Sequence, residues 1–135
     1  MVTVRSYVPA QESAWECDVN GAVRIGLSAT FGGSDENRTP EHLYAAALLN
    51  CFIASFQIIA NKSQLTYTAI EGTADTTSGT RDGLSWIESC RIRTVIRGCD
   101  DQDRAHRIVE RAERACIIKN SVETRVEISV SFGDV

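Results

Sequence analysis

Five cysteines and two histidines are the side chains of this sequence best suited to nucleophilic, redox or metal chemistry. The cysteines stand at positions 17, 51, 90, 99 and 116, and the histidines are His42 and His106. No two cysteines form a Cys-x-x-Cys pair and the histidines are not spaced to share an ion, so we expect no metal site. Cys90 falls on the apolar face of a predicted strand, and Cys17 and Cys99 lie near turns without an ionisable partner. We interpret these three as structural thiols.

The other two cysteines occupy more informative positions. Cys51 stands beside Asn50 in the middle of an apolar segment, and Cys116 follows directly on a second predicted helix. A cysteine in an apolar segment is more often core than nucleophile. On spacing alone nothing connects the two, so structural and reactive roles both stay open at this point.

The helix that carries Cys51 begins at Thr39-Pro40-Glu41, where a capping hydroxyl, a proline and a first-turn carboxylate each favour a helix start. Only three plainly polar side chains interrupt residues 43–60: Asn50, Ser55 and Gln57. A membrane span needs about 20 mostly apolar residues. The polar residues and the strand-rich surroundings favour instead a helix that is buried on all sides. Because one chain of this size cannot enclose it, we expect a homodimer and no membrane role.

The spacing of the apolar residues predicts seven elements in the order β-β-α-β-β-α-β, an α+β fold. In chain order they cover residues 15–18, 22–28, 40–60, 66–76, 84–97, 100–115 and 124–132. Asn20-Gly21 is typical of a tight hairpin turn, and a longer turn over residues 77–83 joins the second pair of strands. Acidic residues at the start of the second helix favour its dipole.

Length and composition limit the class of protein. The chain has 135 residues and a net charge of −4, which predicts a single domain over residues 1–135 and excludes a general nucleic-acid binder. The N-terminal residues show no apolar stretch typical of a secretory signal. An odd number of scattered cysteines without such a signal predicts a reducing, cytoplasmic location.

Two motifs then resemble a known family. Residues 39–52 read Thr-Pro-Glu-His-Leu-Tyr-Ala-Ala-Ala-Leu-Leu-Asn-Cys-Phe, with Cys51 ten positions after Glu41, and Cys-Ile-Ile-Lys-Asn-Ser-Val begins at Cys116. In this order they resemble the OsmC-like family, which includes osmotically inducible protein C and the organic hydroperoxide resistance proteins. The resemblance covers nearly the whole chain. It implies the OsmC-like fold, in which a long buried central helix is wrapped by antiparallel strands in an intertwined homodimer.

The resemblance implies thiol-dependent reduction of organic hydroperoxides. The Cys51 thiolate would attack the peroxide and become a sulfenic acid, and Cys116 would condense with it to a disulfide. An external dithiol would then restore both thiols. No cofactor is implied.

A thiolate at Cys51 needs a cation, because the middle of a helix gains little from the helix dipole. The resemblance implies an arginine from the N-terminal half, for which Arg24 and Arg38 are the candidates, and Glu41 would hold that arginine. Ten residues of helix separate Glu41 and Cys51 by about 15 Å. We therefore expect Glu41 of one chain to share a pocket with Cys51 and Cys116 of the other, in two composite sites per dimer.

Two other interpretations stay open. One is a non-catalytic OsmC-like stress protein that binds a small apolar ligand. The other is a hot-dog thioesterase, since that fold also wraps a long apolar helix with antiparallel strands. The order of the strands and the two cysteine motifs argue against the thioesterase.

Overall fold

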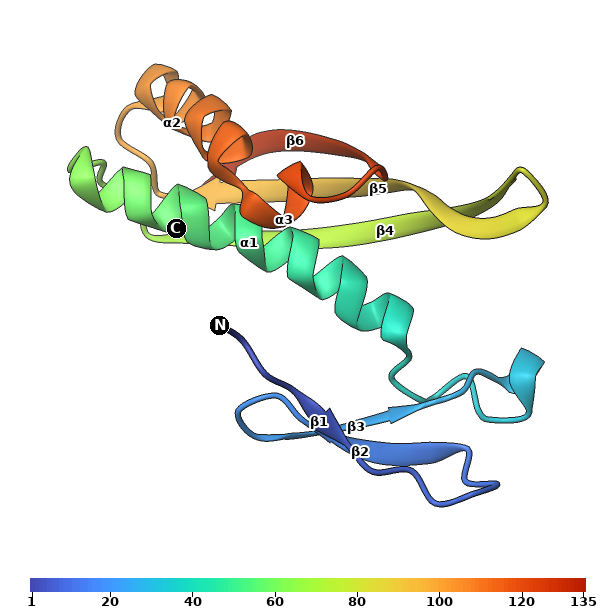
Figure 1. The fold of residues 1–135 in the computed structure, drawn as a ribbon. Helices are drawn as coiled ribbons and strands as arrows, with labels where there is room; N and C mark the ends of the chain where they lie inside the picture. Colours follow the sequence, from blue (N-terminus) through green and yellow to red (C-terminus); the bar gives the residue numbers. More distant parts are fainter. The chain divides into compact units, whose positions relative to one another are not determined.

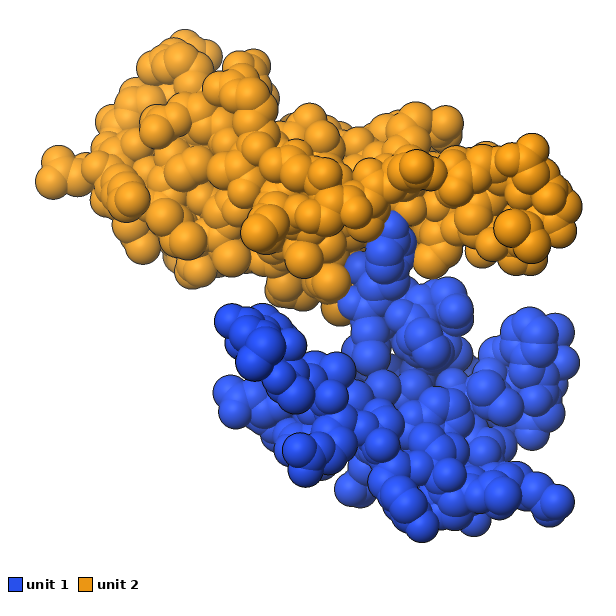
Figure 2. Space-filling model, viewed as in Figure 1, with its two compact units in different colours: residues 1–44 blue, residues 45–135 orange.

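The computed structural model describes all residues from 1 to 135. The chain forms two compact units, Met1–Tyr44 and Ala45–Val135, which Figure 2 shows in different colours. Each unit is described by itself, and the expectation of a single domain stays a prediction. The elements, in chain order, are β1 (Arg5–Ser6), β2 (Ala14–Asp18), β3 (Ala22–Gly26), η1 (Ala29–Phe31), α1 (Pro40–Lys62), β4 (Ala69–Arg81), β5 (Leu84–Arg97), α2 (Gln102–Ala115), α3 (Ile117–Asn120) and β6 (Arg125–Gly133).

The first unit is built on a three-stranded antiparallel sheet in the order β1-β2-β3. The predicted hairpin of β2 and β3 is confirmed, and its turn residues Asn20 and Gly21 both have positive φ, 68° and 134°. Asp18 Oδ1 accepts a hydrogen bond of 3.1 Å from the Gly21 N–H, which closes the turn. The two-residue strand β1 was not predicted, because Arg5–Ser6 is too short to show an alternating pattern.

Helix α1 begins at Pro40, as predicted, and ends at Lys62. The His42 N–H donates to Thr39 Oγ1 at 3.4 Å, and the Thr39 N–H donates to His42 Nδ1 at 2.9 Å. This reciprocal arrangement is a capping box in which histidine takes the place usually filled by Glu or Gln. The buried residues of α1 recur every four positions: Leu48, Phe52, Phe56 and Ala60.

By length and composition, α1 could also cross a membrane. Its most apolar 18-residue window has a mean hydropathy of 1.8, and 22% of that window is buried within the chain. The core helices of many proteins share these properties, so they are weak support for a span. The expectation that α1 is buried on all sides is met within one chain only along the stripe that contains Phe52 and Phe56.

The second unit contains a three-stranded sheet in the order β4-β5-β6. Strands β4 and β5 form the predicted hairpin, but the turn is only Asp82-Gly83 and not the whole of residues 77–83. Both turn residues have positive φ, 53° and 78°. A register shift between Thr77 and Ser78 lets β4 continue through the polar segment that had been assigned to the turn.

Strand β6 runs parallel to β5, which differs from the expectation of antiparallel strands. The physical reason is the connection between them, because α2 carries the chain back along the sheet before β6 begins. Helix α2 starts at Gln102, with Asp101 as its N-cap: Asp101 Oδ1 accepts the Arg104 N–H at 3.0 Å. The short helix α3 was not predicted, because four residues carry no readable periodicity.

The core of the second unit lies between the helices and one face of the sheet (Figure 1). Its fully buried side chains include Phe52 and Phe56 from α1, Ile96 from β5 and Ala112 from α2. Phe56 and Tyr67 also form an edge-to-face pair with ring centroids 5.4 Å apart. The α+β class is confirmed, and the core fixes where the C-terminal end of α2 meets α1.

Candidate functional site

Cys51 lies on α1, next to the stripe that packs into the core. Its neighbour Phe52 is fully buried, whereas Cys51 itself is half-buried. Asn50 is exposed, and its side-chain amide donates to the Ala46 carbonyl one turn earlier at 2.9 Å. The amide therefore bonds back to its own helix. Cys51 thus borders the buried face of α1 without being sealed inside it.

Cys116 occupies the joint between two helices. It is the C-cap of α2 and the N-cap of α3, and it is 1% exposed. Its N–H donates to the Glu113 carbonyl at 3.4 Å, and its carbonyl accepts the Asn120 N–H at 3.0 Å. Asn120 further ties the joint by donating its side-chain amide to the Arg114 carbonyl at 2.9 Å. The backbone around this thiol is therefore firmly held.

The structure brings these two cysteines together. Burial and a hydrogen bond to Cys51 raise the pKa of the Cys116 thiol to about 11, against the smaller lowering effect of the Lys119 and Ile118 backbone N–H groups. A hydrogen bond that raises the pKa of Cys116 stabilises the protonated form of that thiol. Cys51 and Cys116 thus form one hydrogen-bonded pair of sulfurs.

The remaining cysteines are Cys90 and Cys99 in the second unit and Cys17 in the first. Cys90 is fully buried on β5, and burial together with the nearby Asp75 charge raises the pKa of its thiol. Cys17 is buried on β2, and Cys99 donates a weak hydrogen bond to the Asp101 carbonyl at 3.6 Å. All five cysteines are free thiols. No group of three His, Cys, Asp or Glu side chains is placed to hold a metal ion.

The predicted arginines and glutamate belong to the first unit. Arg38 Nη1 donates to the Arg24 carbonyl at 3.5 Å, and both residues line a hollow of about 180 Å³ together with Glu36 and Asn37. Both arginines are exposed and neither forms an ion pair within the chain. Glu41 lies exposed in the first turn of α1. The structure therefore places Arg24 and Arg38 at one hollow. Glu41 stands on the same helix as Cys51, ten residues before it.

Comparison with known proteins decides the family. A family model described as OsmC-like protein matches residues 33–131, which is most of the chain. This chain belongs to the OsmC-like family. The matched range contains both cysteine motifs as well as Arg38 and Glu41, but it begins after Arg24.

Solved structures agree with the fold of this OsmC-like protein. An OsmC-like protein of unknown function from Vibrio cholerae has a TM-score of 0.84 at 20% identity, with 96% of this chain and 98% of that one covered. An organic hydroperoxide resistance protein from Elizabethkingia anophelis has a TM-score of 0.78 at 17% identity, covering 100% and 96%. One from Legionella pneumophila has a TM-score of 0.74 at 18% identity, covering 98% and 96%. No curated protein sequence matches the chain.

Some residues that shape the site of this OsmC-like protein were missed from its sequence. The backbone N–H groups of Ile118 and Lys119, in the first turn of α3, lower the pKa of the Cys116 thiol. The four-residue helix gives no periodic signal, although Asn120 could have suggested a turn. The capping role of His42 was not predicted, although its position three residues after Thr39 is that of the partner residue in a capping box.

Proposed function

We propose that this OsmC-like protein is a thiol-dependent peroxidase that reduces organic hydroperoxides. The observation that carries the proposal is the hydrogen bond between the Cys116 thiol and Cys51. Hydrogen-bonded thiols on two different elements provide the pair of sulfurs that a disulfide-forming cycle requires. The names of the Elizabethkingia and Legionella neighbours as organic hydroperoxide resistance proteins support the same substrate class.

The cycle has three balanced steps. The Cys51 thiolate attacks one oxygen of the hydroperoxide, the O–O bond breaks, and the alkoxide leaves and takes up a proton as an alcohol, while Cys51 becomes a sulfenic acid. The Cys116 thiol then condenses with the sulfenic acid, which forms the S–S bond and releases water. An external dithiol reduces this disulfide by two exchange reactions and is itself oxidised to a disulfide.

The hydrogen bond also supports the assignment of roles. The pKa of the Cys116 thiol is about 11, so Cys116 keeps its proton at neutral pH and suits the resolving role better than the attacking one. Oxidation of Cys51 changes the hydrogen-bond partner that helps to raise the pKa of Cys116. The N–H groups of Ile118 and Lys119 continue to favour the Cys116 thiolate, which is the nucleophile of the second step.

We further propose that the active protein is a cytoplasmic homodimer with composite sites. The Cys51 thiolate would receive its cation from Arg24 or Arg38, and Glu41 of the partner chain would hold that arginine. The absence of any ion pair at these arginines within one chain leaves both guanidinium groups available for this role. The dithiol reductant would act from solvent, and neither nucleic acid nor membrane takes part.

Stopped-flow mixing of the reduced protein with cumene hydroperoxide and with hydrogen peroxide tests the function. We expect fast thiol loss with the organic peroxide, one alcohol formed per site in Cys116→Ser, and no reaction in Cys51→Ser. Cys99→Ser is the matched control, because Cys99 is half-buried like Cys51 but lies apart from the pair. Thiols that are inert to both peroxides would contradict the proposal and would favour a protein that binds a small apolar ligand.

A further inference from the structure

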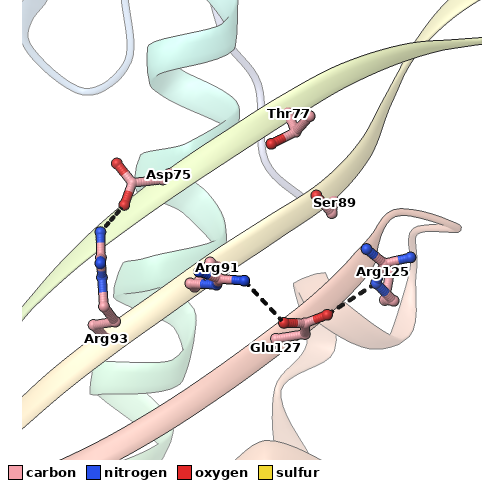
Figure 3. A pocket seen from close by; sticks show the side chains of 7 residues that line it. All are labelled: Asp75, Thr77, Ser89, Arg91, Arg93, Arg125 and Glu127. Atoms are coloured by element: carbon pink, nitrogen blue, oxygen red, sulfur yellow. Dashed lines mark hydrogen bonds and ion pairs between the residues drawn. The ribbon is translucent and has the colours of Figure 1, made fainter.

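The sheet of the second unit has a polar hollow on the face that points away from the core (Figure 3). Its volume is about 190 Å³. The hollow is lined by seven side chains, all polar or charged: Asp75, Thr77, Ser89, Arg91, Arg93, Arg125 and Glu127. Their strand neighbours Cys90 and Ile92 are fully buried on the opposite face. The hollow is thus separated from the cysteine pair by the sheet itself.

The carboxylates of the hollow do not neutralise its arginines. Asp75 pairs with Arg93, which stands diagonally across from it. Glu127 accepts from Arg125 Nε at 3.0 Å and lies 3.9 Å from Arg91 Nη2. Three guanidinium groups therefore face two carboxylates. The Arg91 side chain makes no hydrogen bond within the chain, and the Nη groups of Arg125 are also unused.

Two hydroxyl groups complete one end of the hollow. Ser89 on β5 stands directly opposite Thr77 on β4 and Arg125 on β6. Arg91 is the next outward-facing residue of β5, about 7 Å along the strand from Ser89. The hydroxyls of Thr77 and Ser89 have no hydrogen-bond partner within the chain. This end of the hollow therefore presents unused donors from three adjacent strands.

We propose that this end of the hollow binds a phosphate-type oxyanion, either inorganic phosphate or a phosphomonoester group. Arg91 and Arg125 supply forked N–H donors whose geometry matches phosphate oxygens. Ser89 and Thr77 each supply one O–H donor. A tetrahedral anion has enough oxygens to receive donors from several directions at once. The strands hold these side chains on a rigid frame, so the donors are pre-arranged.

The proposal predicts binding that depends on charge and on salt. The guanidinium groups are more than half exposed, with side-chain exposures of 65% for Arg91 and 66% for Arg125. Exposed charges are screened, so the affinity should fall as sodium chloride is raised from low to physiological concentration. Because the hollow lies on the other face of the sheet, phosphate should bind equally to the wild type and to Cys51→Ser.

A titration of the full-length, reduced, ¹⁵N-labelled protein with inorganic phosphate tests this site. We expect saturable shifts of the Ser89, Arg91 and Arg125 backbone amides. Phenyl phosphate, used in a parallel titration, separates the two sources: tighter binding indicates a phosphomonoester, and equal binding indicates free phosphate. Arg125→Gln and Arg91→Gln should each weaken phosphate binding by at least about tenfold, because each removes a charged donor.

The matched control is Arg107→Gln, which removes an exposed arginine from α2 and changes the net charge equally. Its phosphate affinity should equal that of the wild type. An equal loss in Arg107→Gln would overturn the proposal, because the binding would then reflect net charge alone. The absence of saturable shifts at Ser89, Arg91 and Arg125 with millimolar phosphate would overturn it too. Unchanged amide shifts elsewhere show that each variant is folded.

Discussion

The thiols of Cys51 and Cys116 form a hydrogen bond although Cys51 lies on α1 and Cys116 at the joint between α2 and α3. The contact depends on the packing of α2 against α1, where Ala112 and Phe52 belong to one buried cluster. Ala105 and Ala112 of α2 are fully buried in the same cluster. The pairing of the two sulfurs is therefore a consequence of core packing and not of local chain geometry.

Deprotonation of the Cys116 thiol should lower the free energy of unfolding at alkaline pH. Its folded-state pKa of about 11 lies above that of an unfolded thiol, so the folded state holds the proton more tightly. This stabilisation is complete below about pH 9 and is lost as the pH rises towards 11, on the order of 2 kcal/mol. Burial raises the pKa of Cys90 and of Tyr67 in the same direction. Urea unfolding at several pH values measures the decline.

Cys116→Ser is the variant that isolates this effect, because serine does not titrate in this range. Its alkaline decline should be smaller than that of the wild type, with Cys90 and Tyr67 accounting for the remainder. An identical decline in both proteins would show that Cys116 is not responsible.

The lack of a side chain at Gly72 allows Leu49 of α1 to lie close to strand β4. A Cβ atom at Gly72 would lie 3.0 Å from Leu49 Cδ1 and from Thr94 Cγ2, and 3.2 Å from the Arg93 carbonyl oxygen. Gly72→Val should therefore destabilise the protein by about 1–3 kcal/mol through overpacking. Because Leu49 precedes Cys51 by two residues, the same variant should slow formation of the Cys51–Cys116 disulfide. Denaturant unfolding measures the loss of stability. The rate at which the Cys116 thiol disappears after Cys51 has been oxidised measures the formation of the disulfide.

The control for this variant is Thr73→Val on the same strand. Thr73 is exposed, so its replacement should change stability by less than about 0.5 kcal/mol. If the two valine variants behave alike, strand propensity and not helix approach explains the result.

The capping box at the start of α1 predicts the order of stability of three variants. Thr39→Ala removes the oxygen that accepts the His42 N–H and should cost about 1 kcal/mol of unfolding free energy. His42→Gln should retain stability, because a glutamine oxygen can still accept the Thr39 N–H, whereas His42→Leu should not. Chemical denaturation ranks the three. Equal stability of the Gln and Leu variants would show that the Nδ1 acceptor is not used.

Much of this fold could be predicted from the sequence because the signals were local. The Asn20-Gly21 turn, the start of α1 at Thr39-Pro40 and the alternation of β6 each depend on residues close in the chain. The parallel pairing of β5 with β6 could not be predicted, because it depends on how α2 returns the chain. The strand extension beyond Thr77 depended on a register shift that no residue type announces.

The candidate site was predictable only in part. Cys51 and Cys116 were selected through the family resemblance, since their spacing carries no information by itself. The raised pKa of the Cys116 thiol depends on its burial, which is a tertiary property. The outward-facing hollow around Arg91 was not foreseen, because its residues come from three strands whose register is a tertiary property.

One face of α1 is left exposed by the single chain, and this face predicts a dimer. Four residues spaced by four positions are exposed: Ala46, Asn50, Ala54 and Ile58. Each of them stands two positions from a residue of the buried stripe that contains Phe52 and Phe56, so they lie on the opposite side of the helix. Three of the four are apolar and two are small, which permits close helix contact. Sedimentation at micromolar concentration should show a dimer, and Ile58→Glu, at a position 56% exposed within the chain, should shift it to monomer.

Gln57→Glu is the control, because it adds the same charge at the neighbouring exposed position of α1. It should leave the dimer intact. A wild-type protein that sediments as a stable monomer would contradict both the dimer and the composite site.

The composite site itself predicts complementation between two inactive chains. Glu41 and Cys51 are ten residues apart on one helix, about 15 Å along its axis, so a glutamate side chain cannot reach the thiol of its own helix. Antiparallel contact of two α1 helices about a two-fold axis would place the start of one beside the middle of the other. A mixed dimer of Glu41→Gln and Cys51→Ser chains would then contain one site with both native residues and one with neither.

Co-expression of the two variants with different affinity tags and tandem purification yields this mixed dimer. About half of the wild-type rate of organic hydroperoxide reduction per dimer is expected, while each homodimeric variant should be almost inactive. Adding Arg38→Gln or Arg24→Gln to one chain at a time then identifies the chain and the arginine that serve the surviving site. If each site were built within one chain, the mixed dimer would be as inactive as its parents, and the partner contribution of Glu41 would be wrong.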